Sequence, residues 1–372
     1  MTGQRWAWVE VDLDAVRHNV STLKGLTSQG TLFMAVVKAD GYGHGAVEVA
    51  RAALDAGADR LGVATIAEGA ELRAAGITAP VQLLSEPPAD GADAVLDHEL
   101  IPTVTTREFA GALGRAAIAR GTEARFHLKV DTGMNRIGVP IDEAPVFAAM
   151  LAEFPGLMHE GTFTHFATAD VPGDWEFGRQ LARFSSVLEA MRAEGVSPGI
   201  VHAANSPATI LSDESHFDMV RCGIAIYGLA PSPQTRGVVP LRPAMSVRAR
   251  ATLVKRIGMG EGVSYGLTWH AGSPTTIATL PLGYADGVHR VLSNKMSVLG
   301  GGARLQQVGR ICMDQFMVEV PRGAVFSRGD QVVLVGQHAD EVQSMDDLAD
   351  LAGTINYEMA CSFGMRLPRL YL

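Results

Sequence analysis

In the first two thirds of the chain, short apolar runs alternate with longer amphipathic or alanine-rich stretches, which is the pattern of repeated βα units. Eight parallel strands with helices between them predict an α/β fold of the (β/α)8 TIM-barrel type, and an open doubly wound sheet is the competing arrangement. The eight runs are TLFMAVV (31–37), RLGVAT (60–65), PVQLL (80–84), LIPTV (100–104), ARFHLKV (124–130), LMHEGTFTHF (157–166), IVHAA (200–204) and FDMVR (217–221).

The helices between these runs are predicted from helical spacing and from the glycines that follow them. Val187 and Met191 lie four positions apart, which places them on one face of a helix. Gly57, Gly76 and Gly195 each come just past a predicted helix, where glycine commonly ends the helix. The spacing therefore supports an alternation of strands and helices.

The pattern changes after residue 230. The segment APSPQTRGVVPLRP is rich in proline and turn-forming residues. Later segments alternate apolar and polar positions between glycine-rich turns, as antiparallel strands do. They are SVRARATLVKRIG, TTIATLPLGYADG, KMSVLGGGARLQQVGRICMDQFMVEV and DQVVLVG. We therefore expect a barrel in residues 1–235 and a β-rich C-terminal domain in residues 236–372.

Composition excludes several classes of protein. Apolar residues make up 47% of the chain and charged residues 19%, and no apolar stretch approaches the roughly 18 residues of a membrane span, so we expect no membrane association. The N-terminal run MTGQRWAWVEVDLDAV lacks the pattern of a secretory signal, which predicts a cytoplasmic protein. A net charge of −9 without a basic cluster argues against nucleic-acid binding. Cys222, Cys312 and Cys361 are too scattered for a disulfide framework or a metal cluster, so we expect reduced thiols and no metal.

Polar residues follow the predicted barrel strands at their C-terminal ends, where the working residues of such barrels lie. They are Lys38 and Tyr42 after the first strand, His165 at the end of the sixth, Asn205 and Ser206 after the seventh, and Arg221, Gly223 and Ile224 at or after the eighth. Because such barrels often bind phosphate after strands seven and eight, the last five positions form a candidate phosphate site. The fold alone would allow many reactions, including sugar-phosphate isomerisation.

Lys38 interrupts an apolar run and precedes three glycines, in AVVKADGYGHG. A lysine in a desolvated pocket has a lowered pKa and can form an imine with a carbonyl compound, so Lys38 is a candidate attachment point for a carbonyl cofactor. The alternative is a lysine that merely ends a strand.

The run AVVKADGYGHG resembles the lysine motif of alanine racemases, a family of barrel enzymes that use pyridoxal phosphate. Eight further segments resemble that family in the same order: LKVDTGMNRIG (128–138), FTHFATAD (163–170), HAANSPA (202–208), VRCGIAIYG (220–228), GVSYG (262–266), LPLGYADG (280–287), GRICMDQ (309–315) and TINYE (354–358). The resemblance implies that Lys38 carries pyridoxal 5′-phosphate as a Schiff base. It also implies an isomerase that interconverts L-alanine and D-alanine and supplies D-alanine for cell-wall peptidoglycan.

Racemisation needs a proton-transfer group on each face of the reacting carbon. The resemblance assigns these roles to Lys38 and Tyr265. It places His165 against Tyr265, and Arg221 against both His165 and the pyridine nitrogen of the cofactor. An arginine there cannot readily protonate the ring, which weakens the electron sink and suppresses transamination, so Arg221→Glu should increase such side products. The alternatives are a surface tyrosine, a core histidine and an arginine in a salt bridge.

Further roles are implied by the same resemblance. Candidate phosphate ligands are Tyr42, Ser206, Tyr357 and the backbone amides of Gly223 and Ile224, with Asn205 in support. Arg136 and Met313 would orient the substrate, and Lys129 matches a position that is carbamylated in some members. The alternatives are a helix N-cap for Ser206 and a surface-facing lysine for Lys129.

The passage into the active site would be lined by Asp170, Tyr284, Arg290, Arg310 and Ile355, by resemblance, and a narrow passage would favour a small amino acid. In the family the residue matching Tyr265 comes from the second subunit, which implies a homodimer with shared active sites.

Three other kinds of pyridoxal-phosphate protein have a related barrel. An amino-acid decarboxylase of the same class would pair an acidic residue with the ring nitrogen, which Arg221 argues against. A broad-specificity racemase of the same fold remains an alternative, and so does a non-catalytic pyridoxal-phosphate carrier, although such carriers lack the β-rich domain.

Overall fold

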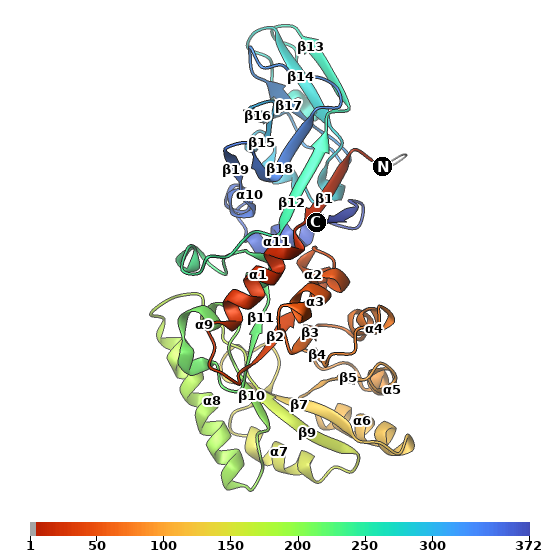
Figure 1. Ribbon diagram of the computed structural model, residues 1–372, viewed down its shortest axis with the longest axis vertical. Coiled ribbons are helices and arrows are strands. Elements are labelled where there is room, and N and C mark those ends of the chain that lie inside the picture. Colours follow the sequence, from red (N-terminus) through yellow and green to blue (C-terminus); the bar gives the residue numbers. More distant parts are fainter. Residues whose placement is uncertain (1–4) are drawn as a thin grey trace. The chain divides into compact units, whose positions relative to one another are not determined.

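The computed structural model describes residues 5–372, and the chain forms two compact units (Figure 1). The barrel unit contains Asp14–Gly41 and Ala46–Arg242. The β-rich unit contains residues 5–13, Tyr42–Gly45 and Pro243–Leu372. The β-rich unit therefore includes a short segment, Tyr42–Gly45, that follows Lys38 closely in the sequence.

The barrel unit is built on parallel strands in the order β5-β4-β3-β2-β11-β10-β9-β7-β6. Their bounds are β2 (Leu32–Val36), β3 (Arg60–Val63), β4 (Val81–Leu83), β5 (Leu100–Ile101), β6 (Thr103–Val104), β7 (Ala124–Asp131), β9 (Leu157–Phe163), β10 (Ile200–His202) and β11 (Met219–Cys222), and the short β8 (Val139–Pro140) pairs with β7. All eight predicted runs are strands, and the (β/α)8 prediction is confirmed.

The fourth predicted run closes the barrel in two halves. Its first half, β5, pairs with β4, and its second half, β6, pairs with β7. Pro102 lies between them and has no N–H to donate, although its carbonyl accepts from the His127 amide at 3.0 Å. The proline therefore divides one strand without opening the ring.

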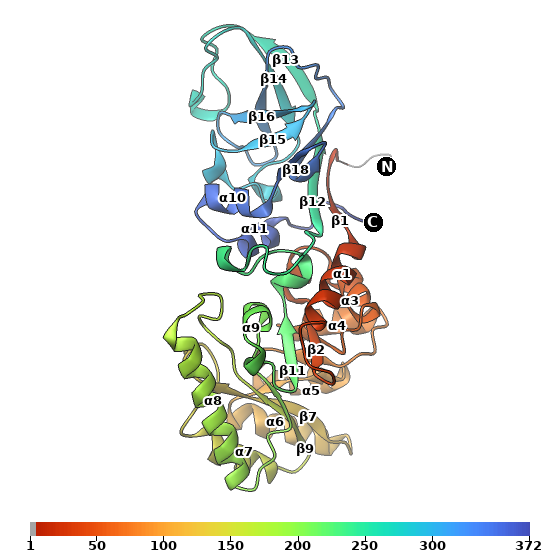
Figure 2. The same ribbon diagram turned by 60° about the vertical axis from the view of Figure 1, so that its left-hand side comes forward.

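Helices alternate with the barrel strands. Figure 2 shows α6 and α7 beside β7 and β9. Gly57, Gly76 and Gly195 follow α3, α4 and α8 with positive φ, as the sequence predicted for helix ends. The helices are α1 (Leu13–Lys24), α2 (Lys38–Tyr42), α3 (Ala46–Asp55), α4 (Ile66–Ala74), α5 (Ala92–Asp97), α6 (Arg107–Ala119), α7 (Ala144–Ala152), α8 (Trp175–Ala193) and α9 (Ser206–Leu211).

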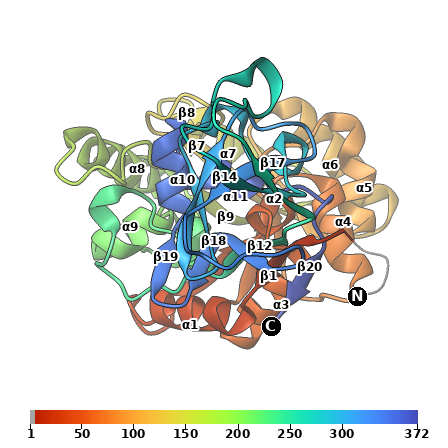
Figure 3. The same ribbon diagram turned by 90° about the horizontal axis from the view of Figure 1, so that it is seen from above.

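The β-rich unit is a largely antiparallel sheet in the order β13-β14-β17-β16-β15-β18-β12-β1-β20, with β19 on β18. Figure 3 shows β12, β1 and β20 side by side, and β1 pairs with β20 in parallel. The elements are β1 (Ala7–Val11), β12 (Met245–Arg250), β13 (Leu253–Ile257), β14 (Thr275–Leu280), β15 (Ser297–Gly300), β16 (Ala303–Val308), β17 (Phe316–Val320), β18 (Gln331–His338), β19 (Glu341–Gln343), β20 (Arg369–Tyr371), α10 (Met345–Ala352) and α11 (Asn356–Ser362). The prediction of a β-rich C-terminal domain is therefore confirmed.

Candidate active site

Lys38 directly precedes a turn of left-handed backbone. Residues 39–42 all have positive φ, between 51° and 59°. For residues other than glycine this conformation costs about 1–2 kcal/mol each, so the surrounding structure must hold it. The Ala39 amide donates to Glu68 Oε1 at 2.7 Å, and the Glu68 side chain also completes a capping box with Thr65 at the start of α4. The turn that follows Lys38 is thereby tied to a neighbouring helix.

Arg221 lies on β11 and is almost fully buried. Its Nη2 donates to the carbonyls of Thr164 at 2.8 Å and Ala203 at 3.0 Å, and lies 3.2 Å from Nδ1 of His165. Its Nη1 lies 3.1 Å from Nδ1 of His202. Burial lowers the pKa of Arg221 to about 9, which still leaves the guanidinium charged near neutrality. The alternative of a salt bridge is wrong, since no carboxylate of residues 5–372 pairs with it.

Lys129 lies on β7 and is buried, so the alternative of a surface-facing lysine is wrong. Burial, and then the charges of Arg221, Arg136 and Lys38, lower its pKa to about 7, and Asp131 opposes this shift. Nζ of Lys129 and Cζ of Arg221 each lie over the aromatic ring of Phe163, 5.3 Å from its centre. Four cationic side chains thus share one region of the barrel unit, and an anion bound there would relieve their repulsion.

Burial and this charge cluster together keep His165 in its neutral form. Burial, followed by the charge of Arg221, lowers the pKa of His165 well below its usual value. A guanidinium can only donate, so Nδ1 of His165 accepts from Arg221 and its proton must reside on Nε2. His165 therefore offers one N–H donor of defined position.

A small anion cradle lies after β10 and β11. The hydroxyl of Ser206 accepts from the Gly223 amide at 2.9 Å and lies 3.5 Å from the Ala225 amide. Ile224 begins the 3₁₀ helix Ile224–Tyr227, so its amide faces the same end of the helix. Hydroxyl and amide groups that converge at helix starts suit a phosphate group.

Asn205, rather than Ser206, is the N-cap of α9. Its side chain accepts from the Ala208 amide at 3.2 Å and donates to the Phe166 carbonyl at 3.4 Å. The alternative role of Ser206 as the cap is therefore wrong, because Ser206 is the first residue within the helix. Asn205 fixes the loop in which Ser206 lies.

Two tyrosines from distant parts of the sequence meet in the β-rich unit. The rings of Tyr42 and Tyr357 have their centres 6.3 Å apart, and Tyr357 lies on α11. Burial, and then the neighbouring Cys361, raise the pKa of Tyr42 well above its usual value. Tyr42 thus stays neutral and can donate a hydrogen bond through its hydroxyl group.

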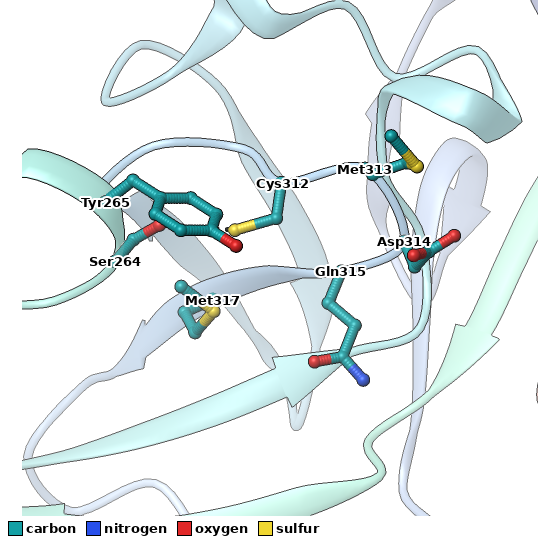
Figure 4. Close-up of a pocket in the computed structure, with 7 residues that line it drawn as sticks. All are labelled: Ser264, Tyr265, Cys312, Met313, Asp314, Gln315 and Met317. Atoms are coloured by element: carbon teal, nitrogen blue, oxygen red, sulfur yellow. Dashed lines mark hydrogen bonds between the residues drawn. The ribbon is translucent and has the colours of Figure 1, made fainter.

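Tyr265 lies in a short 3₁₀ turn at the edge of an open pocket, and 73% of its surface is exposed. Figure 4 shows its ring and the Cys312 side chain in this pocket, with Met313 on the loop beyond. The hydroxyl of Ser264 donates to the Arg310 carbonyl at 2.6 Å and lies 3.3 Å from Sγ of Cys312. The turn that carries Tyr265 is therefore anchored to the loop that carries Met313. In the single chain Tyr265 is a surface tyrosine, as in the alternative interpretation, although it lies in a turn and not on a strand.

The Met313 loop also packs tightly against the turn of Tyr284. The Tyr284 amide donates to the Cys312 carbonyl at 3.0 Å, and the Ala285 amide donates to the Met313 carbonyl at 3.0 Å. A Cβ atom on Gly283 would lie 2.2 Å from the Met313 carbonyl oxygen. Only glycine allows this approach.

The residues predicted to line the passage are only partly brought together. Tyr284 borders the Met313 loop, and Arg310 lies beside Gly266 of the Tyr265 turn. Arg290 and Ile355 also belong to the β-rich unit, where Arg290 begins the 3₁₀ helix Arg290–Leu292 and Ile355 is the N-cap of α11. Asp170 belongs to the barrel unit, where its carbonyl accepts from Ser232.

Sequence reasoning missed three residues behind Arg221, namely the buried His202 and His127 and the partly buried Glu160. His202 lies within the segment HAANSPA but was given no role there. The alternation of His127 and Lys129 on β7 was an available signal, because residues two apart on a strand face the same side. The register of β7 against β9 and β10 was needed to bring the three together.

Residues 5–372 have two further features that bear on the kind of site. They contain no group of three or more histidine, cysteine or acidic side chains placed to hold a metal ion. None of their helices has the length and apolar character required to cross a membrane.

The side chains of the barrel unit fit a phosphate-bearing carbonyl compound. Three neighbouring cations lower the pKa of Lys129 and Asp131 opposes them, so an anionic group beside Lys129 is electrostatically favoured. The Ser206 cradle supplies donors for phosphate, and Lys38 supplies an amine beside the cluster. Pyridoxal phosphate has this combination of a carbonyl group and a phosphate group.

Comparisons with known proteins agree with this assignment. Residues 11–231 match the family model for the alanine racemase N-terminal domain, and residues 244–371 match that for the C-terminal domain. The alanine racemase of Desulfovibrio desulfuricans is 45% identical over 99% of this chain and 98% of its own length.

Solved structures give the same result. The alanine racemase of Bacillus anthracis with bound L-Ala-P has a TM-score of 0.94 and 38% identity, over 100% of this chain and 96% of that one. The alanine racemase of Bartonella henselae with covalently bound pyridoxal phosphate has a TM-score of 0.88 and 30% identity, over 98% of this chain and 99% of that one.

Fold, site and relatives together define a pyridoxal-phosphate-dependent isomerase of the barrel-plus-β class. The chain belongs to the alanine racemase family, and its activity is that of an alanine racemase.

Proposed function

We propose that the chain racemises alanine with two bases, Lys38 on one face of the α-carbon and Tyr265 on the other. One base removes the α-proton and the conjugate acid of the other returns a proton to the opposite face. The observation that carries this proposal is the chemistry of the two half-sites. The barrel unit offers a lysine amine within a cation cluster, and the β-rich unit offers an exposed tyrosine at a pocket.

Lys38 holds the cofactor before the substrate amine replaces it, and its freed amine then acts as base. Pyridoxal phosphate, when bound, withdraws electrons from the α-carbon of an attached amino acid and so acidifies the α-proton. Ser206, Tyr42, Tyr357 and the amides of Gly223 and Ile224 hold the phosphate, and Asn205 supports their loop.

Arg221 donates to the pyridine nitrogen and keeps the ring unprotonated. Its guanidinium is buried and charged, and its four hydrogen-bond partners in the barrel unit fix its plane. A group that donates without releasing its proton limits the lifetime of the negative charge on the substrate. The side chain thereby favours proton return over transamination.

His165 tunes Tyr265. Its proton lies on Nε2, because Nδ1 accepts from Arg221. A hydrogen bond from Nε2 to the phenolic oxygen of Tyr265 would stabilise the phenolate, together with the positive field of the barrel cluster. The tyrosine can then accept a proton near neutral pH.

Arg136 and Met313 orient the substrate carboxylate, the first by its charge and the second by its backbone amide. Lys129 is carbamylated in this proposal. With a pKa lowered to about 7, a large share of its amine is neutral near neutrality and can add CO2 with release of a proton. The added negative charge would hold Arg136 in place.

The working enzyme is proposed to be a cytoplasmic homodimer that supplies D-alanine for peptidoglycan. Tyr265, Leu267 and Met313 are all more than half exposed in the single chain, which suits burial against a second subunit. In this arrangement residues 1–235 contribute the lysine-bearing barrel and residues 236–372 the second base. Asp170, Tyr284, Arg290, Arg310 and Ile355 line the passage to the shared site.

The decisive experiment is incubation of the purified yellow protein with L-alanine and L-serine in separate reactions, with optical rotation followed over time. Loss of rotation with alanine is expected, and its absence would overturn the proposal. Comparable loss with serine would favour the broad-specificity alternative.

Borohydride reduction followed by peptide mapping tests the role of Lys38. The modified peptide is expected to contain Lys38, and Lys38→Ala should carry no adduct and lose racemisation by about a thousandfold or more. A non-catalytic carrier would give the adduct with no racemisation in the wild-type protein, and an adduct at another lysine would contradict the assignment.

A further inference from the structure

A chain of buried hydrogen bonds crosses the interior of the barrel unit behind Arg221. Nδ1 of His202 lies 3.1 Å from Nη1 of Arg221, and Nε2 of His202 lies 2.7 Å from Nδ1 of His127. Nε2 of His127 lies 3.0 Å from Oε2 of Glu160. Both histidines are fully buried, and the Glu160 side chain is 11% exposed. These hydrogen bonds thus join Arg221, the arginine expected to contact the cofactor, to the carboxylate of Glu160 near the surface.

Glu160 is ionised in this setting. Arg60 binds it in a bidentate manner, at 3.0 and 3.2 Å, and Arg125 adds a longer contact at 3.4 Å. Burial would raise its pKa, but the hydrogen bonds from His127 and Arg60 outweigh burial and lower the pKa to about 2. An ionised carboxylate can only accept hydrogen bonds, so the end of the chain has a fixed polarity.

The two histidines are neutral. Burial is the largest cause that lowers the pKa of His127, and Glu160 only partly opposes it. Burial, followed by the proximity of His127 and Arg221, lowers the pKa of His202 well below its usual value. A neutral imidazole has one donor nitrogen and one acceptor nitrogen.

The positions of the protons follow from the two ends. Glu160 accepts, so His127 carries its proton on Nε2 and accepts at Nδ1. His202 must then donate from Nε2, which leaves Nδ1 as an acceptor for the guanidinium of Arg221. All three hydrogen bonds point toward Glu160.

We propose that Glu160 is a positioning residue for Arg221. Its carboxylate sets the tautomers of His127 and His202, so that Nδ1 of His202 is a hydrogen-bond acceptor. This acceptor holds and polarises the guanidinium of Arg221, which has no carboxylate partner of its own among residues 5–372. The ring of His202 is also stacked on Phe163, with 4.7 Å between ring centres and 5° between planes, so its orientation is fixed. Polarised chains of this kind transmit charge through a low-dielectric interior.

The effect of these hydrogen bonds on the reaction rests on the proposed function, because it requires Arg221 to contact the cofactor ring. The proposed tautomers of His127 and His202 do not depend on that contact. Without the carboxylate charge, Arg221 becomes a stronger hydrogen-bond donor to that ring. More turnovers should then end in transamination, in which the amino group passes to the cofactor and pyruvate is released.

The first test is nitrogen NMR of the holoenzyme labelled with ¹⁵N in its histidine rings, with His127 and His202 assigned by single substitutions. Both are expected to carry the proton on Nε2. A proton on Nδ1 of His202 would overturn the proposal, because Arg221 could not then donate to that atom. This readout does not depend on activity.

The second test compares Glu160→Gln with Glu10→Gln. Glu10 is a matched control, because it also pairs with an arginine, Arg248, and its side chain is 19% exposed, but it lies in the β-rich unit. Glu160→Gln should raise the pyruvate released per D-alanine formed by about three- to tenfold, whereas Glu10→Gln should leave this ratio unchanged. A purely structural role would lower thermal stability and kcat without changing the ratio, and would overturn the proposal.

A double-mutant cycle separates the effect that Glu160 exerts through the histidine hydrogen bonds from other effects of its charge. In a His127→Phe background the chain is already broken, so Glu160→Gln should change the pyruvate ratio by less than twofold. A full effect in that background would contradict the proposal. Failure of the wild-type protein to racemise alanine would overturn the proposed function, whereas racemisation with an unchanged ratio in Glu160→Gln would overturn only the role of Glu160.

Discussion

The two half-sites of this chain are built in different ways. In the barrel unit, Arg221 and Lys129 are buried. Burial lowers the pKa of Arg221 to about 9, and burial together with neighbouring cations lowers the pKa of Lys129 to about 7. In the β-rich unit, Tyr265 and Met313 are exposed on short turns that backbone hydrogen bonds and close packing hold in place. The difference indicates that substitutions in the first act mainly through charge and those in the second mainly through backbone position.

The largest effect is expected for Tyr265→Phe, which removes a proton-transfer group and leaves the exposed ring in place. Racemisation should fall by about 10²–10⁴-fold, the usual contribution of a positioned acid or base. Cofactor content, measured by absorbance, and the thermal midpoint should not change. Retention of more than a tenth of the wild-type rate would show that Tyr265 is not the second base.

Gly283→Ala tests the β-rich half-site through its backbone. The new Cβ would lie 2.2 Å from the Met313 carbonyl oxygen and must displace that loop. The KM for alanine is expected to rise about tenfold with a smaller change in kcat, and stability should fall by about 1–3 kcal/mol. Gly272→Ala is the control, since a Cβ there meets no atom within 4 Å. Equal effects of the two substitutions would contradict this account.

The response of activity to CO2 at different pH values tests the role of Lys129 in the barrel half-site. Because its pKa is lowered to about 7, the amine is mostly protonated below that pH and mostly neutral above it. Bicarbonate added to CO2-depleted enzyme should therefore raise activity several-fold at pH 8 and much less at pH 6. Lys129→Gln should abolish the bicarbonate effect, and a dependence that survives this substitution would place the reactive amine elsewhere.

The smallest effect is expected for Ala39→Gly in the left-handed turn after Lys38. Glycine adopts the φ of 53° at this position without steric cost, so unfolding free energy should stay constant or rise by up to about 1 kcal/mol. Ala152→Gly, at the end of α7, should instead lower it by up to about 1 kcal/mol. Urea denaturation of both variants measures the difference, and a loss at Ala39 as large as that at Ala152 would argue against strain in the turn.

The strands of the barrel were predictable because each is a short apolar run bounded by turns, and all eight are present. The face that each side chain takes was less predictable. Barrel strands are covered on both sides, so alternation does not distinguish the interior from the helix-covered surface. Lys129 was therefore left open to a surface position, although it is buried.

Long-range pairing explains what the sequence did not reveal. The run AWVEV was not assigned to the β-rich sheet, yet β1 lies between β12 and β20 there. Glu160 and His127 contact each other only because of the register between β7 and β9, which includes an irregularity between Phe126 and His127. Resemblance to a family suggested residues near the substrate, but gave no role to the residues that pack behind Arg221.

The pairing of β1 with β12 and β20 has a consequence for the order of events during synthesis. β1 leaves the ribosome before the barrel unit, but its two neighbours follow only after the whole barrel unit has been made. The barrel strands have all their partners by Arg242, so that unit can fold while the first strand waits. The nascent chain must therefore keep an unpaired strand soluble until β12 and β20 have been made, and a chaperone that binds extended apolar segments would have its longest opportunity in this interval.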